Sequence, residues 1–91
     1  VHGRDGVAVA LAGPESIELT WERNSEADLA GYRVYRSDGD QPLSKIADLT
    51  AIAGFSDRAV EHGKRYRYAV SSVDRTGNES APSPPVEIML P

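Results

Sequence analysis

Apolar and polar residues alternate along several short stretches of the chain. The pattern is clearest in residues 17–22, where Ile17, Leu19 and Trp21 take every second position and Glu18 and Thr20 lie between them. Side chains of a β-strand point alternately to its two faces, so this spacing predicts a strand with one buried face. The same reasoning predicts strands at residues 7–11, 17–22, 31–37, 45–48, 51–57, 64–74 and 86–90.

The longest alternating stretch is residues 64–74. It places Tyr66, Tyr68 and Val70 on one face and Arg65 and Arg67 on the other, which predicts an aromatic inner face and a basic outer face.

Two shorter stretches follow the same rule. In residues 31–37 the inward positions are Tyr32 and Val34. In residues 45–48 we expect Ile46 to pack inward while Lys45 and Ala47 face outward.

Turn signals separate these stretches. They include Gly13-Pro14, Asp38-Gly39-Asp40 and Thr76-Gly77-Asn78, and residues 25–30 offer at most one helical turn. Many short strands joined by turns predict an all-β fold, a seven-stranded antiparallel immunoglobulin-like β-sandwich.

The length of 91 residues fits a single domain spanning residues 1–91. Within it we expect an N-terminal linker at residues 1–5 and a proline-rich lead into the last strand at residues 82–85. The chain starts at Val1 and shows no export signal of its own, so we interpret it as a segment of a longer protein.

Composition narrows the function classes. The net charge of −4, from 10 basic and 14 acidic residues, lacks the positive excess that nucleic-acid binding needs. No cysteine is present, which excludes disulfides and thiolate metal sites. The apolar runs are far shorter than the roughly 20 residues of a membrane span, so we expect no membrane crossing.

Metal binding and catalysis find little support in the residues. His2 and His62 are far apart, whereas a zinc site needs three or four ligands. Residues 38–40 lack the spacing of a calcium loop and are better explained as a hairpin tip. Serine-nucleophile and phosphate-loop motifs are also missing.

Three aspartates, Asp28, Asp57 and Asp74, fall at expected strand ends. A carboxylate in that position commonly accepts a local backbone N–H. We therefore predict no catalytic, cofactor or metal site.

Aromatic residues dominate the expected core because large rings bury the most area in a small domain. The predicted core residues are Trp21, Tyr32, Val34, Val60, Tyr66, Tyr68 and Val70.

The order and spacing of five motifs resemble the fibronectin type III domains found in bacterial multidomain secreted proteins. These motifs are residues 17–21, 28–36, 55–57, 63–70 and 74–80. The resemblance implies that the Tyr66 hydroxyl reaches back to backbone in the corner of residues 58–63, above Val60. His62-Gly63 replaces the family's usual Pro-Gly, and the Arg-Gly-Asp adhesion loop is absent.

The same resemblance implies a non-catalytic spacer or interaction module of a larger bacterial protein that is secreted or held in the cell envelope. We expect it to be a monomer whose partners are neighbouring domains.

An alternative function is binding of a protein or polysaccharide through one sheet face. Arg33, Tyr35, Arg65 and Arg67 should share the outer face of the sheet that contains residues 31–37 and 64–74. An anionic glycan or acidic protein would suit this basic face, with an Arg stacked on Tyr35. An ordinary solvated sheet face explains the same residues. The loop tips at residues 24–28 and 75–78 form a second, less informative candidate.

Overall fold

The computed structural model describes residues 9–21 and 28–91, and within them it contains strands and no helix. The strands are β1 (Val9–Ala12), β2 (Ile17–Thr20), β3 (Leu29–Asp38), β4 (Ser44–Thr50), β5 (Gly54–Asp57), β6 (Arg65–Asp74) and β7 (Val86–Met89).

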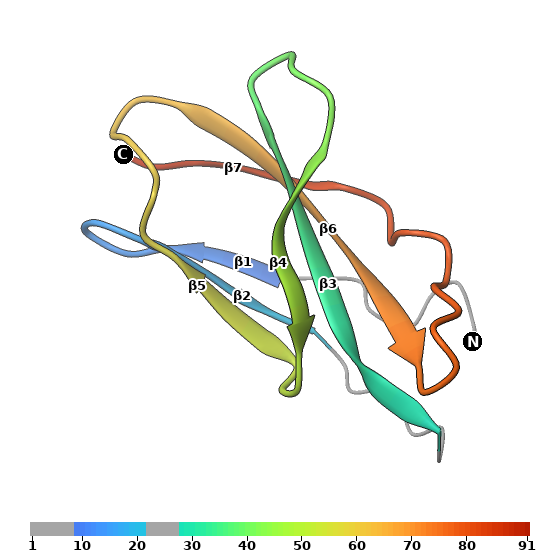
Figure 1. Ribbon diagram of the computed structural model, residues 1–91. Coiled ribbons are helices and arrows are strands. Elements are labelled where there is room, and N and C mark those ends of the chain that lie inside the picture. Colours follow the sequence, from blue (N-terminus) through green and yellow to red (C-terminus); the bar gives the residue numbers. More distant parts are fainter. Residues whose placement is uncertain (1–8, 22–27) are drawn as a thin grey trace.

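Two antiparallel sheets pack against each other (Figure 1). One has the order β1-β2-β5 and the other β4-β3-β6-β7. The long β3–β6 pair runs from Leu29 opposite Asp74 to Asp38 opposite Tyr66. The prediction of a seven-stranded antiparallel sandwich is confirmed. Strand β7, which follows the prolines, lies at a sheet edge, where a missing N–H costs little.

Several predicted boundaries differ from the structure. Leu29 and Ala30 belong to β3 and not to a helical turn, and β5 starts only at Gly54, after a bend at residues 51–53. The predicted linker at residues 1–5, the start of the first strand and residues 22–27, including the end of the second predicted strand, lie outside the described residues.

The outward position predicted for Ala47 is wrong. Ala47 is half-buried and packs against the core, as Ile46 does. The β3–β4 register shifts on both sides of Val34, and Leu49 has a φ of 65°. Each extra residue in a strand reverses its alternation between faces, which a period-two pattern does not reveal.

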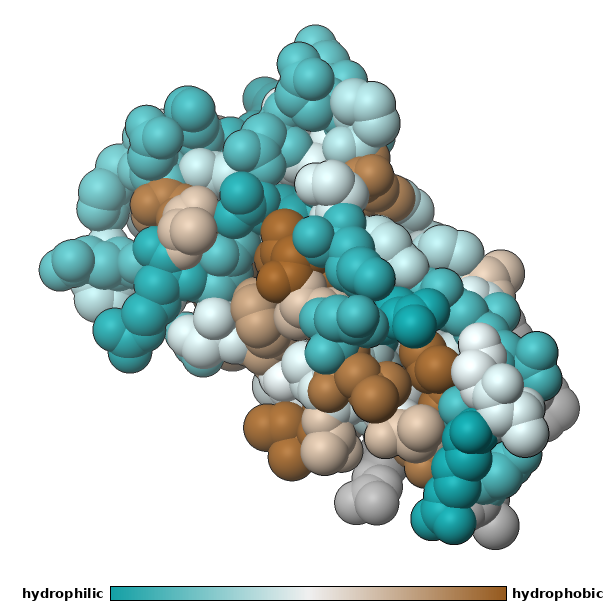
Figure 2. All heavy atoms as spheres, viewed as in Figure 1, coloured by the Kyte–Doolittle hydropathy of each residue, from teal (hydrophilic) through white to brown (hydrophobic). Residues whose placement is uncertain are grey.

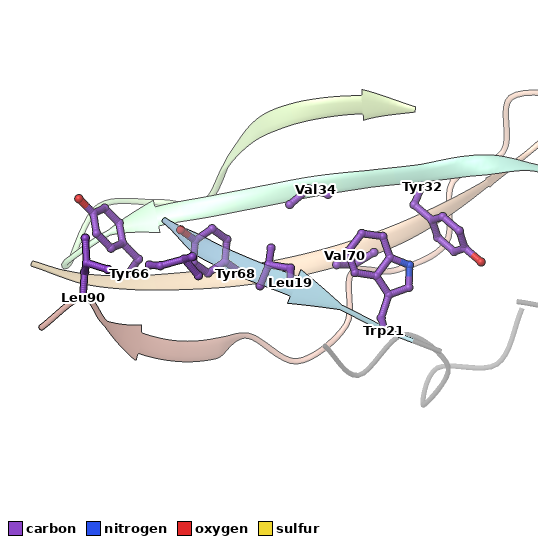
Figure 3. Close-up of a cluster of buried hydrophobic side chains, with 9 residues drawn as sticks. Leu19, Trp21, Tyr32, Val34, Tyr66, Tyr68, Val70 and Leu90 are labelled. Atoms are coloured by element: carbon purple, nitrogen blue, oxygen red, sulfur yellow. The ribbon is translucent and has the colours of Figure 1, made fainter. Parts of the chain in front are cut away.

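Aromatic rings from both sheets fill the interior (Figure 3). Trp21, directly after β2, meets Tyr32 of β3 edge to face, with ring centroids 5.4 Å apart at 73°. Tyr66 and Tyr68 of β6 lie toward the other end, 6.4 Å apart. The buried cluster comprises Ile17, Leu19, Trp21, Tyr32, Val34, Tyr66, Tyr68, Val70 and Leu90, and the half-buried Val60 packs against it.

The Tyr66 hydroxyl closes the corner before β6. It accepts the backbone N–H of Glu61 at 2.8 Å, which is the contact that the family resemblance implied. Gly63 has a φ of 80° and its N–H donates to the Leu90 carbonyl at 2.7 Å. Glycine adopts this left-handed conformation without steric cost, so His62-Gly63 serves where the family has Pro-Gly.

Replacing Tyr66 with Phe tests this corner. The change removes the acceptor of the Glu61 N–H, and we expect the free energy of unfolding in urea to fall by about 1 kcal/mol. Val60→Ala, which removes packing beneath the corner, should cost about 2 kcal/mol. Equal stability of Tyr66→Phe and the unchanged chain would contradict the assignment.

Candidate functional site

The structure places Arg33, Tyr35, Arg65 and Arg67 along β3 and β6 on the outer face of the four-stranded sheet. In the register of that sheet, Arg33 lies opposite Ser71 and Tyr35 opposite Ala69. Because Tyr32 and Val34 are buried in the core, the residues that alternate with them point away from it.

Only two of these four side chains converge. Arg33 and Tyr35 meet at Glu79, whereas the Arg65 Nε pairs with Glu87 at 3.1 Å on β7. The Arg67 guanidinium donates to the Ser37 hydroxyl at 3.3 Å. The face is therefore a row of separate internal contacts.

We call Arg33, Tyr35, Asp48, Ser71 and Glu79 the Glu79 cluster. Arg33 bridges two carboxylates, Glu79 at 2.7 Å and Asp48 at 2.9 Å. The hydroxyls of Tyr35 and Ser71 both donate to Glu79. One carboxylate thus ties the segment after β6 to β3 and to β6 itself.

These contacts favour the ionised form of the two carboxylates and the neutral form of Tyr35. The hydrogen bonds from Ser71 and then Tyr35 hold the pKa of Glu79 below its usual value, with a smaller contribution from Arg33. Burial and then the contact with Glu79 raise the pKa of the Tyr35 hydroxyl. The hydrogen bond from Arg33 lowers the pKa of Asp48.

Two serines of the segment between β6 and β7 pair with β6, next to the part of β6 that β7 pairs with. Ser83 accepts the Val70 N–H through its Oγ at 3.0 Å and donates its own N–H to the Val70 carbonyl at 2.8 Å. Ser80 makes the equivalent pair with Ser72 at 3.0 and 2.9 Å. Serine hydroxyls therefore replace backbone acceptors along this proline-rich segment.

Local turns account for two of the aspartates singled out in the sequence. Asp74 Oδ1 accepts the N–H groups of Thr76 and Asn78 at 3.0 and 2.9 Å, and Asp57 accepts that of Ala59 at 3.1 Å. The prediction of local acceptors is confirmed for both. For Asp28 the contact found is made by its backbone carbonyl, which accepts the Arg75 N–H at 2.9 Å.

Asp57 has a second role that the sequence did not reveal. Its Oδ2 accepts the Tyr68 hydroxyl at 2.6 Å and the Arg36 Nη1 at 2.9 Å, and its side chain is only 5% exposed. Burial and this contact raise the pKa of the Tyr68 hydroxyl well above its ordinary value. The bridge joins β5 to β3 and β6, and so joins the two sheets.

Arg36 also stacks on Tyr66, with its Cζ 5.4 Å from the ring centroid. In the described part of the chain, the cation–π contact found is this one, at Tyr66 and not at Tyr35. The hydroxyl of Tyr35 is held at Glu79 instead. No sequence signal distinguishes Arg36 from its neighbours, because its partner comes from a strand 21 residues away.

The hairpin tip at residues 38–40 is a turn, with Gly39 at a φ of 63° and the Gln41 N–H donating to the Asp38 carbonyl. His62 contacts the Pro91 carbonyl. Across residues 9–21 and 28–91, no group of three or more His, Cys, Asp or Glu side chains is arranged to hold a metal ion. The described residues also contain no helix long and apolar enough to cross a membrane.

The buried bridge predicts a large effect of Asp57→Asn. The change leaves the Arg36 guanidinium without its buried counter-charge, and we expect a loss of about 3 kcal/mol in urea unfolding. Arg65→Met, which breaks the exposed pair with Glu87, is the matched control and should cost under about 1 kcal/mol. Adding Arg36→Met to Asp57→Asn should cost less than the two single changes together. Simple additivity would show that these groups do not interact.

The Glu79 cluster predicts a pH-dependent contribution to stability. Because the folded pKa of Glu79 is lowered, its contribution is present above the ordinary glutamate pKa of about 4.3 and is lost as the pH falls through the lowered value. Glu79→Gln should cost about 1 kcal/mol at pH 7, discounted for partial exposure, and the difference from the unchanged chain should shrink toward pH 3. Tyr35→Phe should act in the same direction but less strongly. A difference that stays constant from pH 7 to pH 3 in urea titrations would contradict the role of this carboxylate.

Comparison with known proteins gives relatives that are much longer than this chain. A segment of an amylopullulanase from Thermoanaerobacterium saccharolyticum is 40% identical over 73 residues, which are 79% of this chain and 6% of that protein. A segment of a poly(3-hydroxybutyrate) depolymerase from Ralstonia pickettii is 37% identical over 78 residues, 86% of this chain and 14% of that protein. The chain therefore spans only a small part of these relatives.

Structural comparison covers nearly the whole domain, whereas no family model matches the sequence. The crystal structure of a Fn3-like protein from Clostridium thermocellum superposes with a TM-score of 0.76 and 28% identity, over 92% of this chain and 88% of that one. With the strand order and the Tyr66 corner, this likeness shows that the chain has the fibronectin type III fold.

Proposed function

We propose that the chain is a non-catalytic structural module that holds neighbouring domains of a larger enzyme at a fixed separation. The observation that carries this proposal is the outer face of the four-stranded sheet. Its Arg33, Tyr35 and Arg65 side chains are bound to carboxylates of the same domain. A partner would have to replace contacts that already satisfy these groups.

The path of the chain supports a spacer. Strands β1 and β7 run in the same direction, so the chain enters β1 and leaves β7 at opposite ends of the strands (Figure 1). The domain is elongated, with principal extents of 40 × 23 × 20 Å. Domains attached before β1 and after β7 would be held apart along the strand direction.

The relatives support a place for this chain within a larger enzyme. By their names, an amylopullulanase and a poly(3-hydroxybutyrate) depolymerase act on polymers, and each contains this segment as a minor part of its length. We propose that this chain likewise belongs to an exported, polymer-degrading bacterial enzyme. Export would bring such an enzyme to polymer outside the cell, because a long polymer does not cross the cell envelope.

Binding of a polysaccharide or protein is the second candidate. A shallow groove on the same sheet face is lined by Tyr35, Leu43, Glu79, Ser80 and Pro82. It ranks second because the Tyr35 hydroxyl and the Glu79 carboxylate, its main polar groups, are bound to each other.

Polymer pull-down distinguishes the two functions. The isolated chain is mixed with amylose, cellulose and poly(3-hydroxybutyrate) particles, and we expect it to stay in the supernatant. Retention that is lost in Tyr35→Ala/Arg67→Ala but kept in the exposed control Lys64→Ala would overturn the spacer in favour of binding. Hydrolysis of any of these polymers by the isolated chain would overturn both.

Domain replacement tests the spacer directly. In the longer enzyme, exchanging this module for an unrelated β-sandwich of equal length should keep polymer hydrolysis within about twofold, since only a rigid separation is required. A flexible Gly-Ser linker of the same residue count should lower the rate of hydrolysis more than the β-sandwich replacement does. Equal rates with both replacements would contradict a spacing role.

A further inference from the structure

The two outer faces of the sandwich differ sharply in chemistry. The outer face of the four-stranded sheet and its covering segment carry Arg33, Lys45, Asp48, Arg65, Arg67, Glu79 and Glu87. On the outer face of β1-β2-β5, Glu18 is bound by the hydroxyls of Ser16 and Ser56 at 2.8 and 2.6 Å, and Arg58, directly after β5, lies near enough to help lower the Glu18 pKa. Among the described residues, this second face therefore carries fewer charges than the first.

Large aliphatic side chains are exposed on the outer face of β1-β2-β5. Val9 pairs with Thr20 and Leu11 with Glu18, so both project outward with those exposed residues. Val9 is 56%, Leu11 65% and Ile52 71% exposed. In an antiparallel sheet with one solvated face, these outward positions are normally polar.

Ile52 borders a shallow groove on the same face. Thr20 and Gly54 lie opposite each other on β2 and β5. Both line the groove together with Glu18, Ile52 and Ser56. Gly54 contributes no side chain to this groove, and a Cβ at its position would lie 3.3 Å from the Leu19 carbonyl oxygen. Figure 2 shows apolar side chains gathered low in the view, where β4 turns toward β5. We call Val9, Leu11, Thr20, Ile52 and Gly54 the aliphatic face.

We propose that the aliphatic face is the docking surface for the domain that precedes this one in the same polypeptide. This inference rests on the proposed function, in which the chain is a module of a larger enzyme. It adds that the preceding neighbour is held by contact and not only by a linker.

The size of the face argues for a tethered partner. Three strands about 4.8 Å apart and four residues long, at about 3.3 Å per residue, present roughly 200 Å². A stable complex of free proteins buries about 800 Å² on each partner. A second copy of the chain would therefore bind weakly here, whereas a tethered domain has an effective concentration in the millimolar range and needs less area.

The position of β1 selects the preceding domain. β1 is the edge strand of its sheet, and its first residue, Val9, belongs to the aliphatic face. The eight residues before Val9 span at most about 28 Å, so a domain attached before them stays within reach. In the relatives, this segment is 6% and 14% of the protein, so most of each polypeptide lies outside it.

Single cysteines provide the test, because the chain has none. Ile52→Cys and Leu11→Cys report on the aliphatic face, and Leu43→Cys, an exposed aliphatic position beside the opposite sheet, is the matched control. Alkylation by iodoacetamide is followed by mass spectrometry of the labelled peptide in the isolated chain, in the longer enzyme and in that enzyme without its preceding domain.

We expect both reporter cysteines to react about tenfold more slowly in the longer enzyme, as for a contact populated about nine-tenths of the time. The rate should recover when the preceding domain is removed, and Leu43→Cys should react alike in all three forms. Equal reporter rates in the isolated chain and the longer enzyme would overturn the docking surface while leaving the spacer function intact.

Three other results would also overturn the proposal. Protection that survives removal of the preceding domain would assign the face to a different neighbour. Protection in the isolated chain that grows with concentration, together with a dimer in sedimentation, would assign it to a second copy. Equal slowing of Leu43→Cys would show general shielding in place of a specific contact.

Discussion

The contact of aromatic rings across the two sheets is the constraint on which the rest of the structure depends. Trp21 comes from the end of β2, while Tyr32 and Tyr68 come from β3 and β6 of the facing sheet (Figure 3). The chain has no cysteine to cross-link it, and a domain of this size buries only about two thirds of its surface. Packing of these rings therefore decides whether the sheets stay together.

Filling the core with tyrosines creates a second requirement, since each buried hydroxyl needs a partner. Tyr66 accepts the Glu61 N–H, and Tyr68 donates to Asp57. The Asp57 carboxylate, once buried, needs a counter-charge, which Arg36 supplies while its guanidinium stacks on Tyr66. The corner, the buried ion pair and the link between the sheets thus all follow from the use of tyrosine in the core.

Alternation along the sequence predicted those features that one strand determines by itself. The inward positions of β2 and β6, the aromatic core and the turn role of Asp74 depend on near neighbours in sequence. Alternation did not predict the position of Ala47 or the start of β3, because a register shift depends on the facing strand.

The carboxylate partners of the candidate face could not be predicted for the same reason. Its carboxylate partners Asp48, Glu79 and Glu87 come from β4, from the segment after β6 and from β7. Only tertiary pairing brings those groups to the arginines, so strand alternation showed the positive charges without their neutralising partners. The exposed aliphatic residues of β1 were visible in the sequence as apolar positions, but alternation alone assigned no face to them.

The fluorescence of Trp21, the one tryptophan in the chain, tests the shared interior most directly. Urea unfolding is followed in the same samples by Trp21 emission and by far-ultraviolet circular dichroism. If the rings form one cooperative core, native emission is blue-shifted and the two transitions coincide. Native emission at the wavelength of a water-exposed indole, or loss of the Trp21 signal well before the strands unfold, would contradict a single interior between the sheets.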